Sequence, residues 1–251
     1  VDIRWTTPNG VAHWLLNERL LDKMKESGCY RLTFGIESGC EETRKFIKKK
    51  VSLEQATRMI QHCNKIGLWT ICTFILGFPY ETKAHMRESI RYAIESGTDM
   101  GVFYALMPHP TSDVYSVFKD EGLLDLDPIM DPAVIKEVSD FAKIGEILSQ
   151  RGSQTKYCSA EEIQEMLSEA YQTFFRARLK NYFLNPLHII RKIRSYEDLR
   201  YAIRLGKELR SPIRNFLSKK RSVINMLWDK YNDKDGFSQA KICKPKNTVK
   251  A

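Results

Sequence analysis

An alternation of amphipathic helix, glycine and apolar strand occurs three times in residues 1–110. Each helix places apolar residues three and four positions apart and is followed by a glycine, which predicts helices over 16–24, 53–66 and 83–96. The strands are predicted at 2–6, 30–36, 69–76 and 102–106. Strands that are apolar throughout and alternate with helices are typical of a parallel sheet covered by helices. The fold class is therefore α/β.

The carboxyl ends of the predicted strands are the places where ligands of such sheets bind. The four segments after the strands are 6–10, 35–39, 77–81 and 107–111, and all contain Gly, Pro or polar residues. Four strands leave open edges, and the chain begins at Val1 rather than at a methionine. We expect that it is a fragment and that a partner segment on its N-terminal side completes the sheet.

The segment Gly35-Ile-Glu-Ser-Gly39 places a carboxylate and a hydroxyl between two glycines, directly after an apolar strand. Glycines at such positions allow the backbone to approach a ligand closely. The tetrapeptide Ile-Glu-Ser-Gly recurs at 94–97, but there it closes a helix, so Gly97 is interpreted as a helix C-terminal glycine and Glu95 as a surface residue. Only the first copy is a candidate site.

The ordered set of motifs resembles the second half of the barrel of radical S-adenosylmethionine enzymes. The resemblance is to the subfamily with an N-terminal cobalamin-binding domain. The residues that carry it are Pro8-Asn-Gly10, 20–29 leading into 34–39, Lys50 with the helix 53–66, Phe74–Thr82, and 108–112. The resemblance implies strands three to six of an open (β/α)6 partial TIM-type barrel.

The resemblance also implies cofactor contacts. Glu37 is expected to accept a hydrogen bond from the ammonium group of S-adenosylmethionine, with Gly35 and Ser38 beside it. Gly77 and Pro79 are expected to form the turn beneath the adenosine. The residues themselves also allow a structural role for each of these two segments. Glu37 would instead cap the helix that begins near Cys40, and Gly77–Glu81 would be an ordinary strand-to-helix turn with Glu81 at a helix start.

In the segment 108–112, Thr111 and Ser112 stand where relatives have glycine and threonine. His109 is a weak candidate for proton transfer on the substrate side, and the alternative is an exposed histidine without a role. Arg4, Trp5 and Tyr104 are candidates for the barrel interior, where Trp5 and Tyr104 are expected to pack in the core.

The six cysteines are Cys29, Cys40, Cys63, Cys72, Cys158 and Cys243, and their spacing matches no CxxC or CxxxCxxC motif. We expect free thiols, with Cys72 in the core, and no metal site in this chain. In the resembled family, a CxxxCxxC motif holds a 4Fe–4S cluster. The cluster ligands are therefore expected outside this chain, as is the domain for a cobalamin, if one is used.

Residues 176–251 carry 20 basic and 6 acidic residues, although the whole chain has a net charge of only +9. We predict a barrel part at 1–122, a linker at 123–132 and a helical basic domain at 133–251, with helices near 133–149, 159–180, 186–193, 195–209 and 212–231. Its basic helices would either dock on an anionic membrane surface, with nucleic acid less favoured, or form an ordinary solvated face.

These observations lead to two functional hypotheses. The first is part of a radical S-adenosylmethionine enzyme that acts on a small-molecule or lipid-like substrate, by hydrogen abstraction or methyl transfer. The alternative is a non-catalytic binding module that uses its basic helices on an anionic partner. No secretory signal or long apolar run is present, so we expect a cytoplasmic protein, with membrane-peripheral contact as an option.

Overall fold

A computed structural model of the chain describes residues 3–49, 52–109, 112–123 and 154–193, together with 196, 199, 200 and 203. Two compact units are present, residues 1–198 and 199–251. In the second unit, the described residues are Leu199, Arg200 and Ile203, which are helical and exposed.

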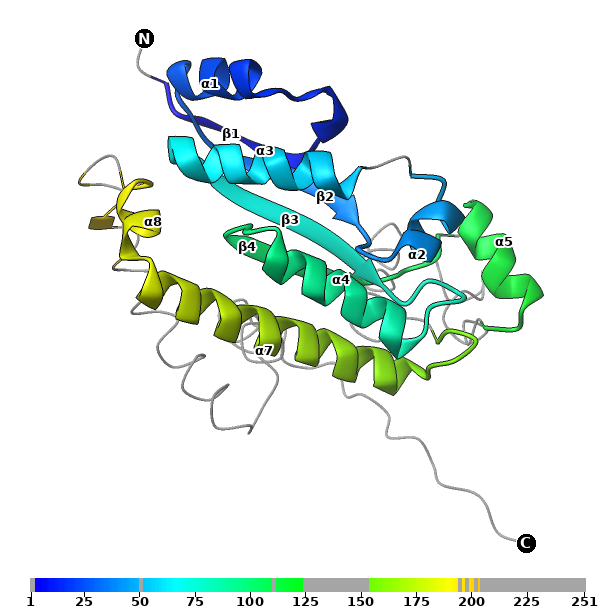
Figure 1. Cartoon of the computed structure of the whole chain (residues 1–251). Coiled ribbons are helices and arrows are strands. Elements are labelled where there is room, and N and C mark those ends of the chain that lie inside the picture. Colours follow the sequence, from blue (N-terminus) through cyan, green and yellow to red (C-terminus); the bar gives the residue numbers. More distant parts are fainter. Residues whose placement is uncertain are drawn as a thin grey trace, which may run out of the picture. The chain divides into compact units, whose positions relative to one another are not determined.

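The first unit is built on a parallel sheet whose four strands follow their order in the chain (Figure 1). The strands are β1 (Trp5–Val11), β2 (Cys29–Glu37), β3 (Trp69–Leu76) and β4 (Met100–Ala105). The helices between them are η1 (His13–Leu15), α1 (Glu18–Glu26), α2 (Glu41–Phe46), α3 (Leu53–Ile66) and α4 (Lys83–Glu95). After β4 come α5 (Asp113–Asp120), α7 (Ala160–Leu184) and α8 (Pro186–Ile190). The predicted α/β parallel sheet is confirmed.

The helix ends follow local rules that the sequence already shows. The Asn17 and Ser52 side chains accept from the backbone N–H three residues later, which caps α1 and α3. Gly67 and Gly97 follow α3 and α4 with positive φ angles of 76° and 81°. This left-handed conformation is the usual end of a helix, and it confirms that the 94–97 copy of Ile-Glu-Ser-Gly is a helix terminus.

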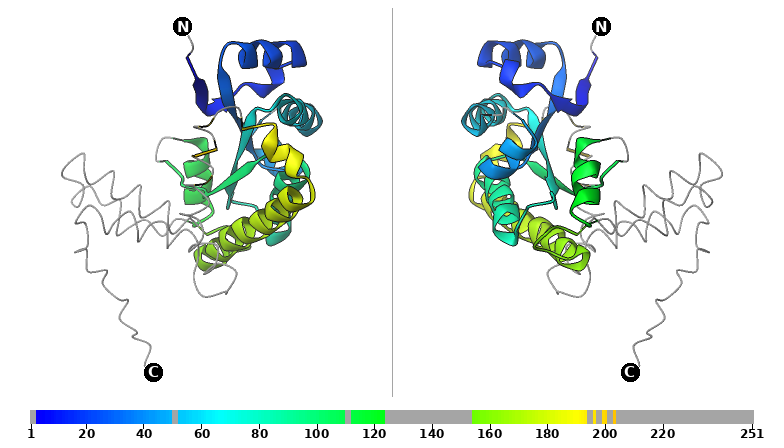
Figure 2. Two further views of the ribbon diagram at one scale, coloured as in Figure 1. Left: turned by 90° about the vertical axis from the view of Figure 1, so that its left-hand side faces the viewer. Right: turned by 90° about the vertical axis from the view of Figure 1, so that its right-hand side faces the viewer.

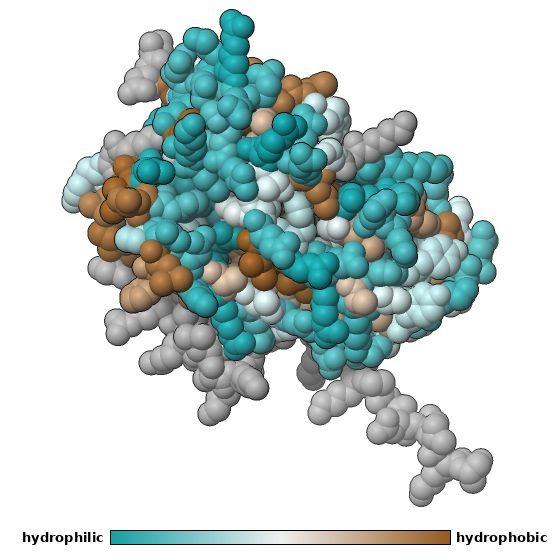
Figure 3. All heavy atoms as spheres, viewed as in Figure 1, coloured by the Kyte–Doolittle hydropathy of each residue, from teal (hydrophilic) through white to brown (hydrophobic). Residues whose placement is uncertain are grey.

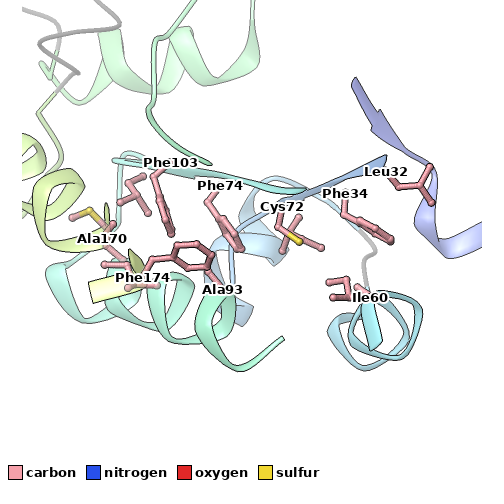
Figure 4. Close-up of a cluster of buried hydrophobic side chains, with 14 of the residues drawn as sticks. Leu32, Phe34, Ile60, Cys72, Phe74, Ala93, Phe103, Ala170 and Phe174 are labelled. Carbon is pink, nitrogen blue, oxygen red and sulfur yellow. The ribbon is translucent and has the colours of Figure 1, made fainter. Parts of the chain in front are cut away.

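One face of the sheet carries the hydrophobic core. The helices α1, α3, α4 and α7 lie on this face, and α5 lies on the other side (Figure 2). Because side chains alternate along a strand, every second residue of β2, β3 and β4 points toward these helices. The Phe74 and Phe103 rings stack with their centroids 5.2 Å apart, and Phe174 of α7 packs on Phe103 at 6.2 Å (Figure 4). Cys72 is fully buried among them, as expected.

The long helix α7 is part of this core rather than a remote extension. It packs against α4 and β4, where the Tyr171 hydroxyl donates to the Phe103 carbonyl oxygen at 3.1 Å. The helices expected near 159–180 and 186–193 are therefore present as α7 and α8. The expected linker at 123–132 lies outside the described residues except for Leu123, as do most of the other helices predicted beyond it. The division into a barrel part and a helical domain stays a prediction.

The first strand was placed wrongly by the sequence pattern. β1 runs over Trp5–Val11, so the segment 6–10, expected as a loop, is inside the strand. The register to β2 is irregular between Thr6 and Gly10, and Pro8, which has no N–H to donate, lies in that stretch. Pairing resumes because Gly10 has no side chain: a Cβ there would lie 3.0 Å from the Gly35 nitrogen.

Candidate functional site

Glu37 ends β2 with a left-handed backbone, at a φ angle of 67°. For a residue with a side chain this conformation costs roughly 1–2 kcal/mol, so it needs support from its surroundings. Alternation along β2 turns Leu32, Phe34 and Ile36 toward the helices and leaves Glu37 on the other face. The Glu37 side chain is 25% exposed, so its carboxylate is shielded from water but accessible.

The partner of this carboxylate is Lys49, in the loop before α3. The Lys49 ammonium lies 2.8 Å from Glu37 Oε1 and donates to the Gly35 carbonyl oxygen, also at 2.8 Å. The Cys40 side chain stands at the N-cap of α2, and no side-chain cap is formed there. Glu37 is therefore half of an ion pair at the carboxyl end of β2, and the interpretation as a helix cap is wrong.

Ser38 and Gly39 face the opposite way, into the protein. The Ser38 hydroxyl is fully buried, lies 3.1 Å from the Ser89 hydroxyl of α4 and accepts from the Cys40 N–H. A Cβ at Gly39 would meet the Glu88 carbonyl oxygen at 2.8 Å. The structure thus brings Gly35, Glu37 and Lys49 together, whereas Ser38 serves the packing of the loop on α4.

The turn after β3 is organised by a buried carboxylate. Gly77 has a positive φ of 94°, and its N–H and that of Phe78 both donate to Glu81 Oε2, at 2.8 and 3.1 Å. The other oxygen, Oε1, accepts from the Thr43 hydroxyl of α2 at 2.9 Å. Burial raises the pKa of Glu81, although these three hydrogen bonds act in the opposite direction. Glu81 directly precedes the Thr82 N-cap of α4, so it lies at a helix start as the alternative had it, and its buried carboxylate holds the turn together.

Gly77 and Pro79 are buried in this turn. The Pro79 carbonyl oxygen accepts from the Lys156 N–H at 2.8 Å, and a Cβ at Gly77 would lie 3.1 Å from the Ile163 side chain of α7. The turn is therefore fixed from two sides. It lies at the same edge of the sheet as Glu37, because β2 and β3 are parallel neighbours.

A mostly apolar cavity of about 380 Å³ opens at the carboxyl end of β4. Its lining includes Ile75, Tyr104, Leu106, Met107, Pro108 and Val114, with His109 and Ser112 as polar members. His109 is exposed, and its carbonyl oxygen accepts from the Ser112 hydroxyl. Tyr104 was expected in the core but is 53% exposed beside this cavity, because β4 turns it to the face without the covering helices. Pro110, Thr111 and Lys50 lie outside the described residues.

The cysteines of the described residues do not form a metal site. Cys29, Cys40, Cys63, Cys72 and Cys158 are all buried thiols. Burial raises the pKa of the Cys63 and Cys72 thiols to about 12, which disfavours the thiolates that an iron–sulfur cluster requires. No group of three His, Cys, Asp or Glu side chains suited to a metal occurs in the part of the chain that the structure describes. These residues do not fit a 4Fe–4S cluster.

Two residues of this edge were missed by sequence reasoning. Lys49 was missed because it is one of three consecutive lysines, and only its position before the Ser52 helix cap marks it. His13 in η1 is fully buried, and burial together with the Lys49 charge lowers its pKa, which favours the neutral imidazole. No motif in the sequence points to it.

Comparisons with known proteins agree with the fold and the motifs. Residues 2–93 match the model of the radical SAM superfamily. The chain is 36% identical over 132 residues to cytidylyl-2-hydroxyethylphosphonate methyltransferase of Streptomyces wedmorensis, covering 50% of this chain and 25% of that protein. It is 26% identical over 195 residues to an uncharacterized methyltransferase of Pyrococcus horikoshii, covering 76% of this chain and 39% of that one. The chain thus spans well under half the length of these relatives.

Among solved structures, the radical S-adenosylmethionine methyltransferase TsrM from Kitasatospora setae, with tryptophan and an S-adenosylmethionine analogue bound, matches with a TM-score of 0.43 and 15% identity. This match covers 66% of the present chain and 34% of that chain. The superfamily model spans β1 to nearly the end of α4, and therefore includes the Glu37 loop and the Glu81 turn. In these residues the chain is similar to the radical SAM superfamily of enzymes.

Proposed function

We propose that this chain supplies the second half of the barrel in a cobalamin-dependent radical S-adenosylmethionine methyltransferase. The superfamily match and the two relatives named as methyltransferases support methyl transfer. The cobalamin part rests on the resemblance of the ordered motifs to the subfamily with a cobalamin-binding domain. A 4Fe–4S cluster on ligands outside this chain would supply the reductive chemistry.

The observation that carries the proposal is the Glu37–Lys49 pair. The methionyl group of S-adenosylmethionine has one ammonium and one carboxylate, and Glu37 and Lys49 present the two complementary charges 2.8 Å apart. Both side chains are about one quarter exposed, so charge-assisted hydrogen bonds to them are only partly screened by water. Glu37 would hold the ammonium group and Lys49 the carboxylate.

The apolar cavity at the end of β4 lies at the same edge of the sheet, since Ile75 pairs with Tyr104 and Glu37 pairs with Phe74. We propose it as the place of an apolar part of the substrate. His109 at its border is retained as the candidate for proton transfer to or from that substrate.

Binding of radiolabelled S-adenosylmethionine to the whole chain, measured by equilibrium dialysis, tests the proposal. Replacing Glu37 by glutamine removes one charge-assisted interaction, so we expect affinity to fall by roughly ten- to a hundredfold. The matched control is Glu95→Gln, in the second Ile-Glu-Ser-Gly copy, where the side chain is exposed at the end of α4. Equal affinities of the two variants would contradict the proposal.

Reconstitution with iron and sulfide under anaerobic conditions is a separate test of the cluster assignment. Since the described cysteines are buried thiols, we expect no stoichiometric cubane signal from this chain alone. A stoichiometric 4Fe–4S spectrum would show that the ligands lie within the chain.

A further inference from the structure

The end of α7 and the short helix α8 expose a cluster of large apolar side chains, here called the α7–α8 corner. Its members are Leu179, Phe183, Leu184, Leu187 and Ile190, which are 43%, 86%, 63%, 62% and 59% exposed. Pro186 begins α8 directly after α7 ends at Leu184, so the two helices meet in a tight bend. Figure 3 shows hydrophobic residues gathered on the side of the molecule where α8 lies in Figure 1.

Four polar side chains of the same segment point inward, those of Arg178, Tyr182, His188 and Lys192. On α7, Arg178 is buried and donates to the Ile94 carbonyl oxygen at 3.1 Å, and the Tyr182 hydroxyl donates to Asp99 Oδ1 at 3.1 Å. On and after α8, His188 Nε2 lies 2.9 Å from Asp99 Oδ1, and the Lys192 ammonium forms an ion pair with the same carboxylate. Lys192 also donates to Asn64 Oδ1 at 2.8 Å and lies over the Trp69 ring.

At the corner, large apolar side chains therefore face the solvent while neighbouring polar side chains are buried. On α7, Arg178 and Tyr182 are held inside while Leu179 and Phe183 face outward. His188 on α8 and Lys192 just after it are likewise held inside, while Leu187 faces outward. Burial of apolar surface is the main favourable term in folding, and contiguous exposed apolar patches mark contact sites. The buried network around Asp99 fixes the apolar side chains outward, so the corner is built to contact something apolar.

The charged residues of the segment 170–196, which forms the corner, are all basic. No aspartate or glutamate occurs from residue 170 to residue 196, whereas Lys180 on α7 and Arg191 directly after α8 are exposed. Apolar side chains flanked by arginine and lysine are the pattern of helices that bind the interface of an anionic bilayer, where the apolar groups enter the acyl boundary and the cations meet lipid phosphates.

We propose that the α7–α8 corner docks this protein on an anionic lipid bilayer. No helix among the described residues is long and apolar enough to span a membrane. The bilayer fits better than a nucleic acid, because the outermost side chains are Phe183, Leu184 and Leu187, which offer nothing to phosphates. It fits better than a second copy, because a symmetric dimer would bring the same positive charges together.

The position of the corner leaves the candidate site accessible. Asp99 precedes β4 and Thr70 lies near the start of β3, and the Thr70 N–H donates to Asp99 at 2.7 Å. The corner is thus at the amino ends of the strands, whereas Glu37 and Gly77 are at the carboxyl ends (Figure 1). Docking through the corner keeps the ligand edge away from the bilayer surface.

Flotation of the whole chain with lipid vesicles tests the proposal and requires neither cofactor nor substrate. We expect binding to mixed phosphatidylcholine–phosphatidylserine vesicles, weaker binding to pure phosphatidylcholine vesicles, and a decrease as salt is added. The double variant Phe183→Gln, Leu187→Gln should lose binding by about tenfold or more, since both apolar groups are removed from the interface. Lys180→Gln with Arg191→Gln should remove the preference for phosphatidylserine.

The matched control is Leu15→Gln, because Leu15 of η1 is 70% exposed but lies outside the corner. It should bind vesicles like the original chain, and circular dichroism should show that all variants keep their helix content. The proposal is overturned if the original chain does not float, or if the corner and control variants float equally. It is also overturned if the corner variant only changes self-association in analytical ultracentrifugation, or only binding to a labelled RNA.

Discussion

The Lys49 ammonium and the Glu37 carboxylate lie 2.8 Å apart at the end of β2, and Glu37 reaches this position with a left-handed backbone. The pair thus combines a strained conformation with two partly shielded charges. Strain of this kind is found where the exact direction of a side chain matters more than stability. The consequences for stability and for binding can be separated by substitution.

Glu37→Gly removes the left-handed strain, roughly 1–2 kcal/mol, but loses the ion pair and adds about 0.5–1 kcal/mol of chain entropy to the unfolded state. We therefore expect the free energy of unfolding in urea to change by less than about 1 kcal/mol. Glu37→Val loses the same pair and keeps a branched side chain at a φ of 67°, so it should be clearly less stable. Equal losses in the two variants would show that the backbone is not strained.

Gly39→Ala should destabilise the fold by about 2 kcal/mol or more, because the new Cβ overlaps with α4. The contacts would be 2.8 Å to the Glu88 carbonyl oxygen and 2.8 Å to Ser89 Cα, and neither is a flexible side-chain end. Gly122→Ala is the comparison: its φ is 66°, but no atom lies within 4 Å of the new Cβ. Thermal unfolding should rank Gly39→Ala as the worse change, and the reverse order would refute the close packing of the loop on α4.

The raised pKa of Glu81 predicts that the stability of the fold depends on pH. Burial raises its pKa above the ordinary 4.5, so the folded state binds the proton more tightly than the unfolded state. The contribution of this group to stability is complete below the unfolded pKa and is lost as the pH rises through the folded pKa. Glu81→Gln does not ionise and keeps an acceptor for the Gly77 and Phe78 N–H groups. Its stability relative to the original chain should therefore increase as the pH is raised from acidic to neutral.

Glu81→Ala is the contrasting change, since it leaves two buried N–H groups without an acceptor, at about 1–3 kcal/mol each. Urea unfolding at several pH values measures both variants. A Glu81→Gln variant whose difference from the original chain does not vary with pH would contradict the raised pKa.

The pKa of Asp99 is shifted in the opposite direction to that of Glu81. Burial alone would raise its pKa, but the hydrogen bond from His188 and the charge of Lys192 outweigh it and hold the pKa below the ordinary 3.8. This stability is present above the unfolded pKa and is lost as the pH falls through the folded pKa. Asp99→Asn leaves Lys192 buried without its counter-charge, so we expect a loss of about 3–5 kcal/mol at neutral pH.

The double variant Asp99→Asn, Lys192→Met removes the uncompensated charge and should recover part of this stability. Asp113→Asn, at an exposed position in α5, is the control and should leave the unfolding free energy nearly unchanged. If Asp99→Asn costs no more than this control, the Asp99 network does not hold α8 on the sheet.

The regular elements could be predicted from the sequence because their signals are local. The helix 53–66 and the strand 69–76 were placed from apolar spacing, the Ser52 cap and Gly67, and the structure confirms them. The bounds of β1 were predicted wrongly because Pro8 and Gly10 are typical of a turn. That the strand continues through them depends on the close approach of Gly10 to Gly35, which lies on the neighbouring strand.

The candidate site could be predicted from the sequence only in part. The strand-end position of Glu37 was predictable, but its partner Lys49 depends on how the loop before α3 returns to β2, which no spacing rule encodes. The burial of Glu81 and the outward turn of Leu187 depend on Thr43 and Asp99, which are far away in the sequence. Contacts of this kind exist only once the sheet has formed.

Glu81 has a consequence that reaches beyond its own turn. One of its oxygens holds the Gly77 and Phe78 N–H groups after β3, and the other holds Thr43 in α2, just past the Glu37 loop. Two neighbouring loops at the ligand edge thus share one carboxylate and cannot shift independently. A ligand that contacts both meets a surface whose parts are already mutually aligned, so little conformational freedom is left to lose on binding.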